Sequence, residues 1–144
     1  QVVVGGPAEA VAAAAEALRA AGARRIVPLQ VVGAYHTPLM APAADALRSM
    51  LARTPAAPPR LPVWSNVTAA PAPAGALADL LLRQLTSPVR WAPLVAGMAA
   101  AGIRTFYEVG CGRVLAGLMR KIAPEASCVV LETPEEIRAV APGI

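Results

Sequence analysis

Short β-branched runs alternate along the chain with long alanine- and leucine-rich stretches, and this alternation limits the folds that the chain can adopt. At the start of the chain, "VVVGG" (2–6) and "RRIVPLQVV" (24–32) flank a stretch made almost entirely of strong helix formers. Pro7 suits the first position of that helix, and Gly22 suits its end. Two strands joined by a helix predict a β-α-β unit with parallel strands.

The same alternation continues through the rest of the chain. Further helices are expected at 38–54, 76–85, 91–101, 113–122 and from 134, and further strands at 61–67, 103–110 and 128–132. A proline-rich connector (55–60) and an Ala/Pro loop (68–75) separate some of these elements. Strands that alternate with helices predict an α/β fold with a mostly parallel sheet.

Composition excludes several classes of protein. Hydrophobic residues make up 56% of the 144 and charged residues 15%, so the chain can fill a core and is not disordered. The longest apolar stretch, 91–103, is shorter than the roughly 18–20 residues of a membrane span, and no signal-peptide pattern opens the chain. The two cysteines fit a reducing compartment. We therefore expect a cytoplasmic protein with no membrane contact.

The charge pattern argues against a nucleic-acid partner. The net charge is +4, but the arginines are scattered, usually one per helix, and aromatic residues make up only 3% of the chain. An acidic protein or a phosphorylated small molecule matches this charge better.

His36, in "GAYHTPLM" (33–40), is the only histidine of the chain and follows directly on an expected strand. In doubly wound α/β sheets, functional groups gather in loops at the carboxyl ends of strands. Its imidazole is also the only side chain whose ordinary chemistry suits proton transfer near neutrality. From the residues alone, a structural loop histidine and a general base both remain open.

No nucleophile for such a base is evident. None of the serines lies in a G-x-S-x-G elbow. Cys111 lies at a strand–turn–helix junction, where a thiol can be activated, but a small residue filling a tight turn between Gly110 and Gly112 is the favoured interpretation. No paired carboxylates, metal-ligand cluster or phosphate loop is present, and "GCGRVL" lacks the dinucleotide-binding spacing.

Four segments, taken in order, resemble the malonyl-CoA:acyl-carrier-protein transacylase family. They are "GAYHTPLM", "VWSNVTA", "LLRQLTSPVRW" and "FYEVGCGRVLAGLMRKI". The resemblance covers essentially the whole chain. It implies part of an α/β-hydrolase-like acyltransferase domain with a ferredoxin-like small subdomain. Residues 1–32 would be the second half of the small subdomain, and 33–144 the C-terminal part of the acyltransferase domain.

The resemblance also implies a mechanism, which is ping-pong acyl transfer by a serine and a histidine. His36 would act as general base and then general acid, and the backbone carbonyl of Gln84 would hold the imidazole N–H. Tyr35 would bind substrate by selecting the acyl group, and Cys111 replaces a proline in a structural turn. No metal or bound cofactor is implied; malonyl-CoA and the phosphopantetheine-bearing acyl carrier protein are the substrates.

Members of this family are about twice as long as this chain, and the serine elbow belongs to the half without a counterpart here. The resemblance therefore implies a C-terminal fragment, inactive alone, whose partner is the missing N-terminal half of the enzyme. Arg113, Arg120 and Lys121 lie on the helix after the "GCG" turn or at its start, and we expect them to dock the acidic carrier protein.

Other functions remain open. The chain is also compatible with the acyltransferase domain of a polyketide synthase or with a malonate decarboxylase transacylase subunit, although the short tail ending at Ile144 favours a discrete enzyme. A non-catalytic module that binds the carrier protein is a third alternative, because the serine is absent. A G-H-S-x-G elbow encoded upstream would decide between transferase and module.

Overall fold

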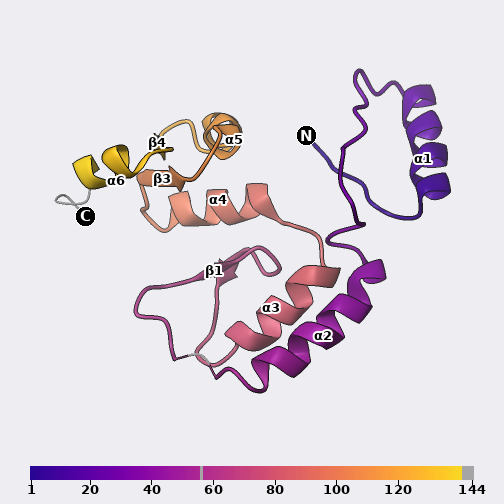
Figure 1. Cartoon of the computed structure of the whole chain (residues 1–144). Coiled ribbons are helices and arrows are strands. Elements are labelled where there is room, and N and C mark those ends of the chain that lie inside the picture. The colour runs from indigo at the N-terminus through magenta and orange to yellow at the C-terminus, as the bar shows by residue number, and fades with distance from the viewer. Residues whose placement is uncertain (56, 141–144) are drawn as a thin grey trace. The chain divides into compact units, whose positions relative to one another are not determined.

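The computed structural model describes residues 1–55 and 57–140. The chain divides into two compact units, the first formed by Gln1–Val67 and Pro71–Val89 and the second by Thr68–Ala70 and Arg90–Ile144. Figure 1 shows the course of the chain and labels its α-helices. Part of the connector expected at 55–60 and the tail from 141 onward lie outside the described residues.

The first unit begins with helix α1 (Ala8–Ala20). The expected helix is confirmed, with Pro7 just outside it at the N-cap. Its end is a Schellman motif, because the N–H of Gly22 donates to the carbonyl of Arg19 at 3.0 Å and that of Ala23 to Leu18 at 2.9 Å. Gly22 adopts the positive φ of 88° that this motif requires.

The prediction of a strand on either side of α1 is wrong for the described residues. Residues 2–6 and 24–32 run without strand structure and pair neither with each other nor with another segment. Val2 is 89% exposed and Val32 97% exposed. A β-branched run favours extended backbone, but a strand forms only when a neighbour accepts its backbone hydrogen bonds. The predicted β-α-β unit is therefore not formed here.

A helical pair makes the core of the first unit. The single helix expected at 38–54 consists of a 3₁₀ turn, η1 (Pro38–Met40), followed by α2 (Ala41–Leu51). Helix α3 (Leu77–Thr86) packs against both η1 and α2, and Figure 1 shows α2 and α3 side by side. Ala44, Leu80 and Leu82 are buried on these two helices.

The strand expected at 61–67 is much shorter in the structure. Only β1 (Trp64–Ser65) is formed, and it pairs with β2 (Ala70–Pro71), which lies in the expected loop. Pro62 has no N–H to donate to a ladder. At the other end, the Ser65 hydroxyl accepts the N–H of Val67 at 3.2 Å and turns the chain out of the strand.

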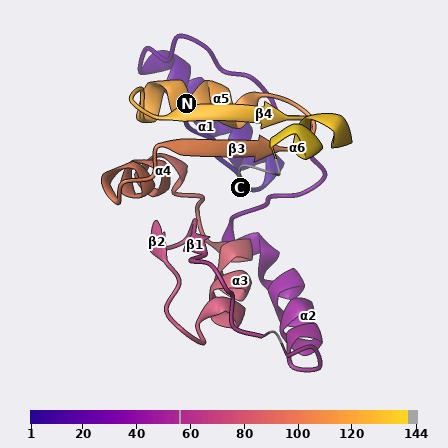
Figure 2. The same ribbon diagram turned by 90° about the vertical axis from the view of Figure 1, so that its left-hand side faces the viewer.

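The second unit carries the parallel sheet. Its elements are α4 (Trp91–Ala100), β3 (Thr105–Val109), α5 (Val114–Ile122), β4 (Ser127–Leu131) and α6 (Pro134–Val140). Strands β3 and β4 pair in parallel and run side by side in Figure 2. Thr105 lies opposite Ser127, and Val109 lies opposite Leu131. Helix α5 makes the crossover between them. These elements confirm the α/β class and the parallel pairing.

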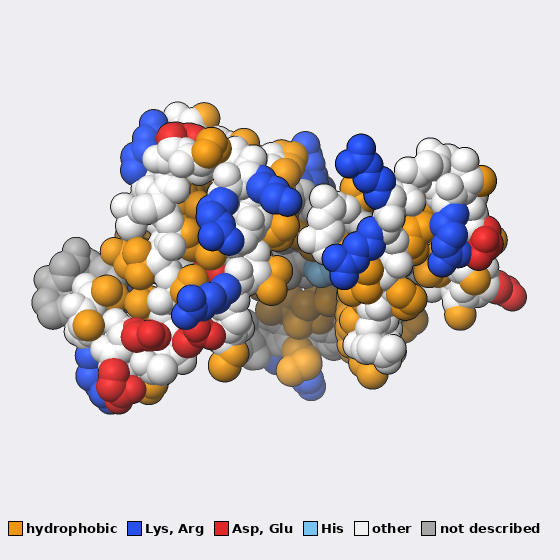
Figure 3. Space-filling view, turned by 90° about the horizontal axis from the view of Figure 1, so that it is seen from above, with side chains coloured by type: hydrophobic (Ala, Val, Ile, Leu, Met, Phe, Trp, Pro, Cys, Tyr) orange, Lys and Arg blue, Asp and Glu red, His pale blue; other side chains and the backbone are white. Residues whose placement is uncertain are grey.

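The core of the second unit is built from small and medium side chains. Leu94, Val95 and Ala99 of α4 are buried, as are Met119 of α5 and Leu131 of β4. Many large hydrophobic side chains remain exposed, and Figure 3 shows them between scattered charges on one face. Within the described part of the chain, no helix combines the length and apolarity needed to span a bilayer.

Candidate active site

His36 lies in a tight loop that fixes its backbone. Its φ is +62°, a left-handed conformation that is uncommon outside glycine. The Thr37 hydroxyl donates to the carbonyl of Ala34 at 2.6 Å, and the N–H of Met40 donates to the carbonyl of Thr37 at 3.0 Å. The loop is therefore held at its base and passes directly into η1.

The imidazole of His36 contacts a backbone group far away in the sequence. Its Nδ1 lies 2.9 Å from the carbonyl oxygen of Gln84, 48 residues further along the chain. A carbonyl can only accept, so Nδ1 carries the hydrogen and Nε2 of the neutral ring keeps its lone pair. In this tautomer, Nε2 is the ring nitrogen that can accept a proton. The contact is the one that the family resemblance implied; the catalytic role of either residue stays a prediction.

The end of α3 makes this carbonyl accessible. Gln84 lies in the last turn of the helix, where carbonyls have no intrahelical partner. The carboxyl end of a helix also carries the negative end of its dipole. The carbonyl of Gln84 is therefore free to accept the N–H of the His36 imidazole.

Tyr35 lies beside the histidine and is 49% exposed. A Cβ built on Gly33 would lie 3.4 Å from Cζ of Tyr35, so the ring lies along the backbone of Gly33. The N-terminal segment also reaches this loop, because a Cβ built on Gly5 would lie 3.2 Å from Cγ2 of Thr37. The ring of Tyr35 therefore belongs to the same loop as the imidazole, and its role in substrate selection stays a prediction.

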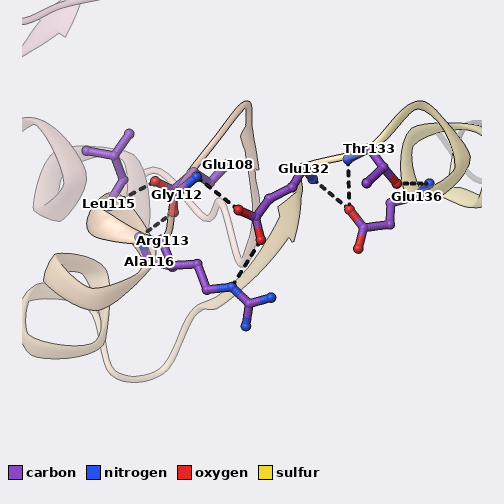
Figure 4. Close-up of polar contacts among 8 residues, drawn as sticks. All are labelled: Glu108, Gly112, Arg113, Leu115, Ala116, Glu132, Thr133 and Glu136. Atoms are coloured by element: carbon purple, nitrogen blue, oxygen red, sulfur yellow. Dashed lines mark hydrogen bonds and ion pairs between the residues drawn. The ribbon is translucent and has the colours of Figure 1, made fainter.

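The glutamate of the "FYEVGCG" segment has a structural role that the sequence reasoning missed. The carboxylate of Glu108, on β3, accepts the N–H of Leu115 at 3.0 Å and that of Ala116 at 2.8 Å (Figure 4). These are orphan donors in the first turn of α5. A carboxylate at a helix N-terminus satisfies them and complements the dipole. The available signal was an acidic residue just before the turn that opens a helix.

A second carboxylate fastens the "GCG" turn. Glu132 accepts the N–H of Gly112 at 3.0 Å and pairs with Nε of Arg113 at 3.2 Å. These contacts, the Gly112 N–H first, lower the pKa of Glu132. Next to it, Glu136 accepts the N–H groups of Glu132 and Thr133, which lower its pKa in turn. The hydroxyl of Thr133 accepts the N–H of Glu136 and completes a capping box at α6.

The three basic residues expected to dock a carrier protein are all exposed. Arg113 and Arg120 line one cavity of about 350 Å³, together with Ser127 and Cys128; Lys121 is not among its lining residues. Arg113 is already paired with Glu132, so Arg120 is the less compensated charge. Their docking role stays a prediction.

Neither cysteine is in a disulfide. Cys111 is exposed in the "GCG" turn. Burial of Cys128, with a smaller contribution from the negative charge of Glu108, raises the pKa of that thiol. Among the described residues, no group of three His, Cys, Asp or Glu side chains is placed to hold a metal ion.

Comparison with known proteins identifies the family of this chain. The acyl transferase domain family matches residues 1–131, so the chain belongs to that family. Within it, the chain is similar to named malonyl transacylases. It is 42% identical over 140 residues to the malonyl CoA-acyl carrier protein transacylase of Salmonella typhimurium. The aligned region is 96% of this chain and 45% of that protein. The family resemblance seen in the sequence is thus confirmed.

Solved structures of malonyl transacylases are similar to this chain as well. An acyl-carrier-protein-S-malonyltransferase from Bartonella henselae is 35% identical, with a TM-score of 0.86 over 95% of this chain and 45% of the other. A type II PKS acyl-carrier protein in complex with its malonyl-transacylase gives 38% identity and a TM-score of 0.85 over 94% and 44%. The polyketide biosynthesis protein ThaF of Burkholderia thailandensis is 34% identical over 87% of this chain, but only 11% of that protein is covered. The chain therefore spans somewhat less than half the length of the malonyl transacylases that it matches.

Proposed function

We propose that the chain is the histidine-bearing part of a malonyl-CoA:acyl-carrier-protein transacylase of fatty acid synthesis. The observation that carries this proposal is the contact between His36 Nδ1 and the Gln84 carbonyl, which leaves Nε2 as a proton acceptor. The similarity to malonyl transacylases over 96% of the chain supports the choice of acyl group and carrier. The acyl carrier protein and malonyl-CoA are the partners; no cofactor takes part.

In the proposed reaction, a serine supplied by the rest of the enzyme attacks the thioester carbonyl of malonyl-CoA while Nε2 of His36 takes its proton. The imidazolium then gives that proton to the departing thiolate of coenzyme A, which leaves a malonyl ester on the serine. The phosphopantetheine thiol of the carrier protein next gives its proton to Nε2 and attacks the ester. The serine oxygen leaves and recovers the proton from His36.

The serine and the binding group for the malonyl carboxylate would come from the part of the relatives that this chain does not cover. Residues 1–32 would complete the small subdomain and 33–144 the acyltransferase domain. The exposed valines at 2–4 and 31–32 support a missing part of the small subdomain, because apolar side chains gathered in this way are normally covered by a packed neighbour.

A polyketide pathway is the second candidate. The observations that favour it are the similarity to the polyketide biosynthesis protein and to the transacylase solved with a type II carrier protein. Both pathways use the same transfer chemistry, so they differ only in the carrier protein that the enzyme prefers.

The test uses a completed enzyme, defined as this chain joined to the N-terminal region of the Salmonella typhimurium relative. Transfer of malonyl from malonyl-CoA to an acyl carrier protein is expected from the completed enzyme and not from the 144-residue chain. An inactive completed enzyme with normal folding contradicts the proposal and favours a non-catalytic carrier-binding module. A burst of coenzyme A from the chain alone contradicts the assignment of the nucleophile, and its loss in Cys111→Ser would identify the thiol responsible.

A further inference from the structure

The carbonyl that holds His36 lacks its regular helical donor. In an α-helix, the carbonyl of one residue accepts the N–H of the residue four positions later. Four positions after Gln84 is Pro88, which has no N–H. The regular continuation of α3 therefore cannot occupy the Gln84 carbonyl.

The tighter alternative is also not formed. A 3₁₀-type bond would join the N–H of Ser87 to the same carbonyl, but no such bond occurs in the described part of the chain. Ser87 is extended, with φ −113° and ψ 149°. This is the conformation that a following proline imposes on the residue before it. Pro88 thus removes one competing donor directly and a second through its effect on Ser87.

The ring of Pro88 has little to do with packing. Pro88 is exposed, whereas α3 is held against α2 by buried leucines such as Leu82. Substitutions at exposed positions without a special backbone role are usually close to neutral for stability. An effect of Pro88 on the site is therefore expected to come from the backbone donors that it removes rather than from packing of its ring.

We propose that Pro88 is a positioning residue for acyl transfer, because its missing N–H reserves the Gln84 carbonyl for Nδ1 of His36. The catalytic meaning of this inference rests on the proposed function, whereas the hydrogen-bond competition does not. An N–H at position 88 would compete with the imidazole for one acceptor. A competing neutral hydrogen bond would lower the ratio of carbonyl-bound to unbound imidazole by a factor of about 2 to 13.

Three variants separate the N–H from the ring. Pro88→Ala supplies an N–H, and Pro88→Ser supplies one with a different side chain. Pro88→lactate has the methyl group of alanine but an ester oxygen in place of the N–H. Pro93→Ala is the matched control, because Pro93 lies in the first turn of α4, where an added N–H has no intrahelical acceptor.

The direct readout is the tautomer of His36, measured by NMR on the 144-residue chain with ¹⁵N-labelled histidine. The chain has a single histidine, so its two ring-nitrogen signals are unambiguous. The unsubstituted chain and Pro93→Ala should keep the hydrogen on Nδ1. Pro88→lactate frees Ser87 but adds no N–H at position 88, so it should shift the hydrogen less than Pro88→Ala does. Pro88→Ala and Pro88→Ser should move a fraction of it to Nε2. In the completed enzyme, kcat/KM should fall about 2- to 13-fold for Pro88→Ala and Pro88→Ser, less for Pro88→lactate, and less than about twofold for Pro93→Ala.

The inference is overturned if Pro88→Ala and Pro88→lactate change the tautomer equally, since the ring would then be responsible. It is also overturned if folded Pro88→Ala and Pro88→Ser keep the tautomer of the unsubstituted chain. An inactive completed enzyme would contradict the proposed function but would leave the tautomer measurement intact, because that readout needs no turnover.

Discussion

Replacing Glu108 with alanine should loosen the start of α5 by a predictable amount. The carboxylate of Glu108 accepts the N–H groups of Leu115 and Ala116, at 3.0 and 2.8 Å. A capping substitution costs about 0.5–2 kcal/mol, and hydrogen bonds to charged groups lie at the upper end of such values. We therefore expect a loss of about 1–2 kcal/mol, which is a factor of about 5–30 in the opening equilibrium of this turn.

Amide hydrogen exchange at Leu115 and Ala116 measures this loss residue by residue. Both amides should exchange about 5–30 times faster in Glu108→Ala, with a smaller change in Glu108→Gln, which keeps an acceptor but loses the charge. Glu125→Ala is the control, because Glu125 is exposed and follows the opposite end of α5. If the two amides exchanged at the same rate in Glu108→Ala and in the unsubstituted chain, the carboxylate would not be the cap.

Three further predictions concern substrate choice, docking and pH. In the completed enzyme, Tyr35→Ser should narrow the preference for malonyl over methylmalonyl, which one methyl group limits to roughly 10–200-fold. The measurement is kcat/KM for both thioesters, and equal slowing of both would show that Tyr35 supports the loop and does not select the acyl group. Charge reversal at Arg113 and Arg120 should raise the KM for the carrier protein in a salt-dependent way and leave malonyl-CoA kinetics unchanged; unaltered carrier kinetics would remove this cavity from the docking surface. Because folding lowers the pKa of Glu132 from 4.5, its contribution to stability is present above pH 4.5 and is lost as the pH falls through the lower value of the folded protein. The free energy of unfolding of Glu132→Gln should therefore be lower than that of the unsubstituted chain above pH 4.5, and the two values should converge in acid. A difference that persists in acid would show that the ionised carboxylate of Glu132 is not its cause.

The helices were predictable from the sequence because their signals are local. Helix α1 has strong helix formers and a glycine at its end, and α5 follows a turn between two glycines. The parallel pairing of β3 and β4 was predictable as well, because the helix between them leaves room for a crossover connection.

The absence of strands at 2–6 and 24–32 could not be foreseen from the sequence. Their residues favour extended backbone, but pairing depends on a neighbour that a local pattern does not contain. The strand expected at 61–67 was cut short for local reasons, by Pro62 and by the side chain of Ser65.

For the candidate site, the loop position of His36 was expected from the end of a β-branched run. Its left-handed backbone was not, because no glycine marks the position. The contact with Gln84 joins residues 48 apart, and only the family resemblance pointed to it. Pro88, in contrast, carries a local signal: it removes the helical donor of one particular carbonyl.

In the proposed site, His36 acts as the base, and the backbone, not the side chain, of Gln84 holds it. The most direct measurement is kcat/KM for malonyl transfer by the completed enzyme carrying His36→Ala or Gln84→Ala. His36→Ala should lose roughly 10²–10⁴-fold, because it removes general-base catalysis. Gln84→Ala should lose far less, since alanine keeps the carbonyl that contacts Nδ1. Comparable losses for the two variants, or full activity of His36→Ala, would contradict the account.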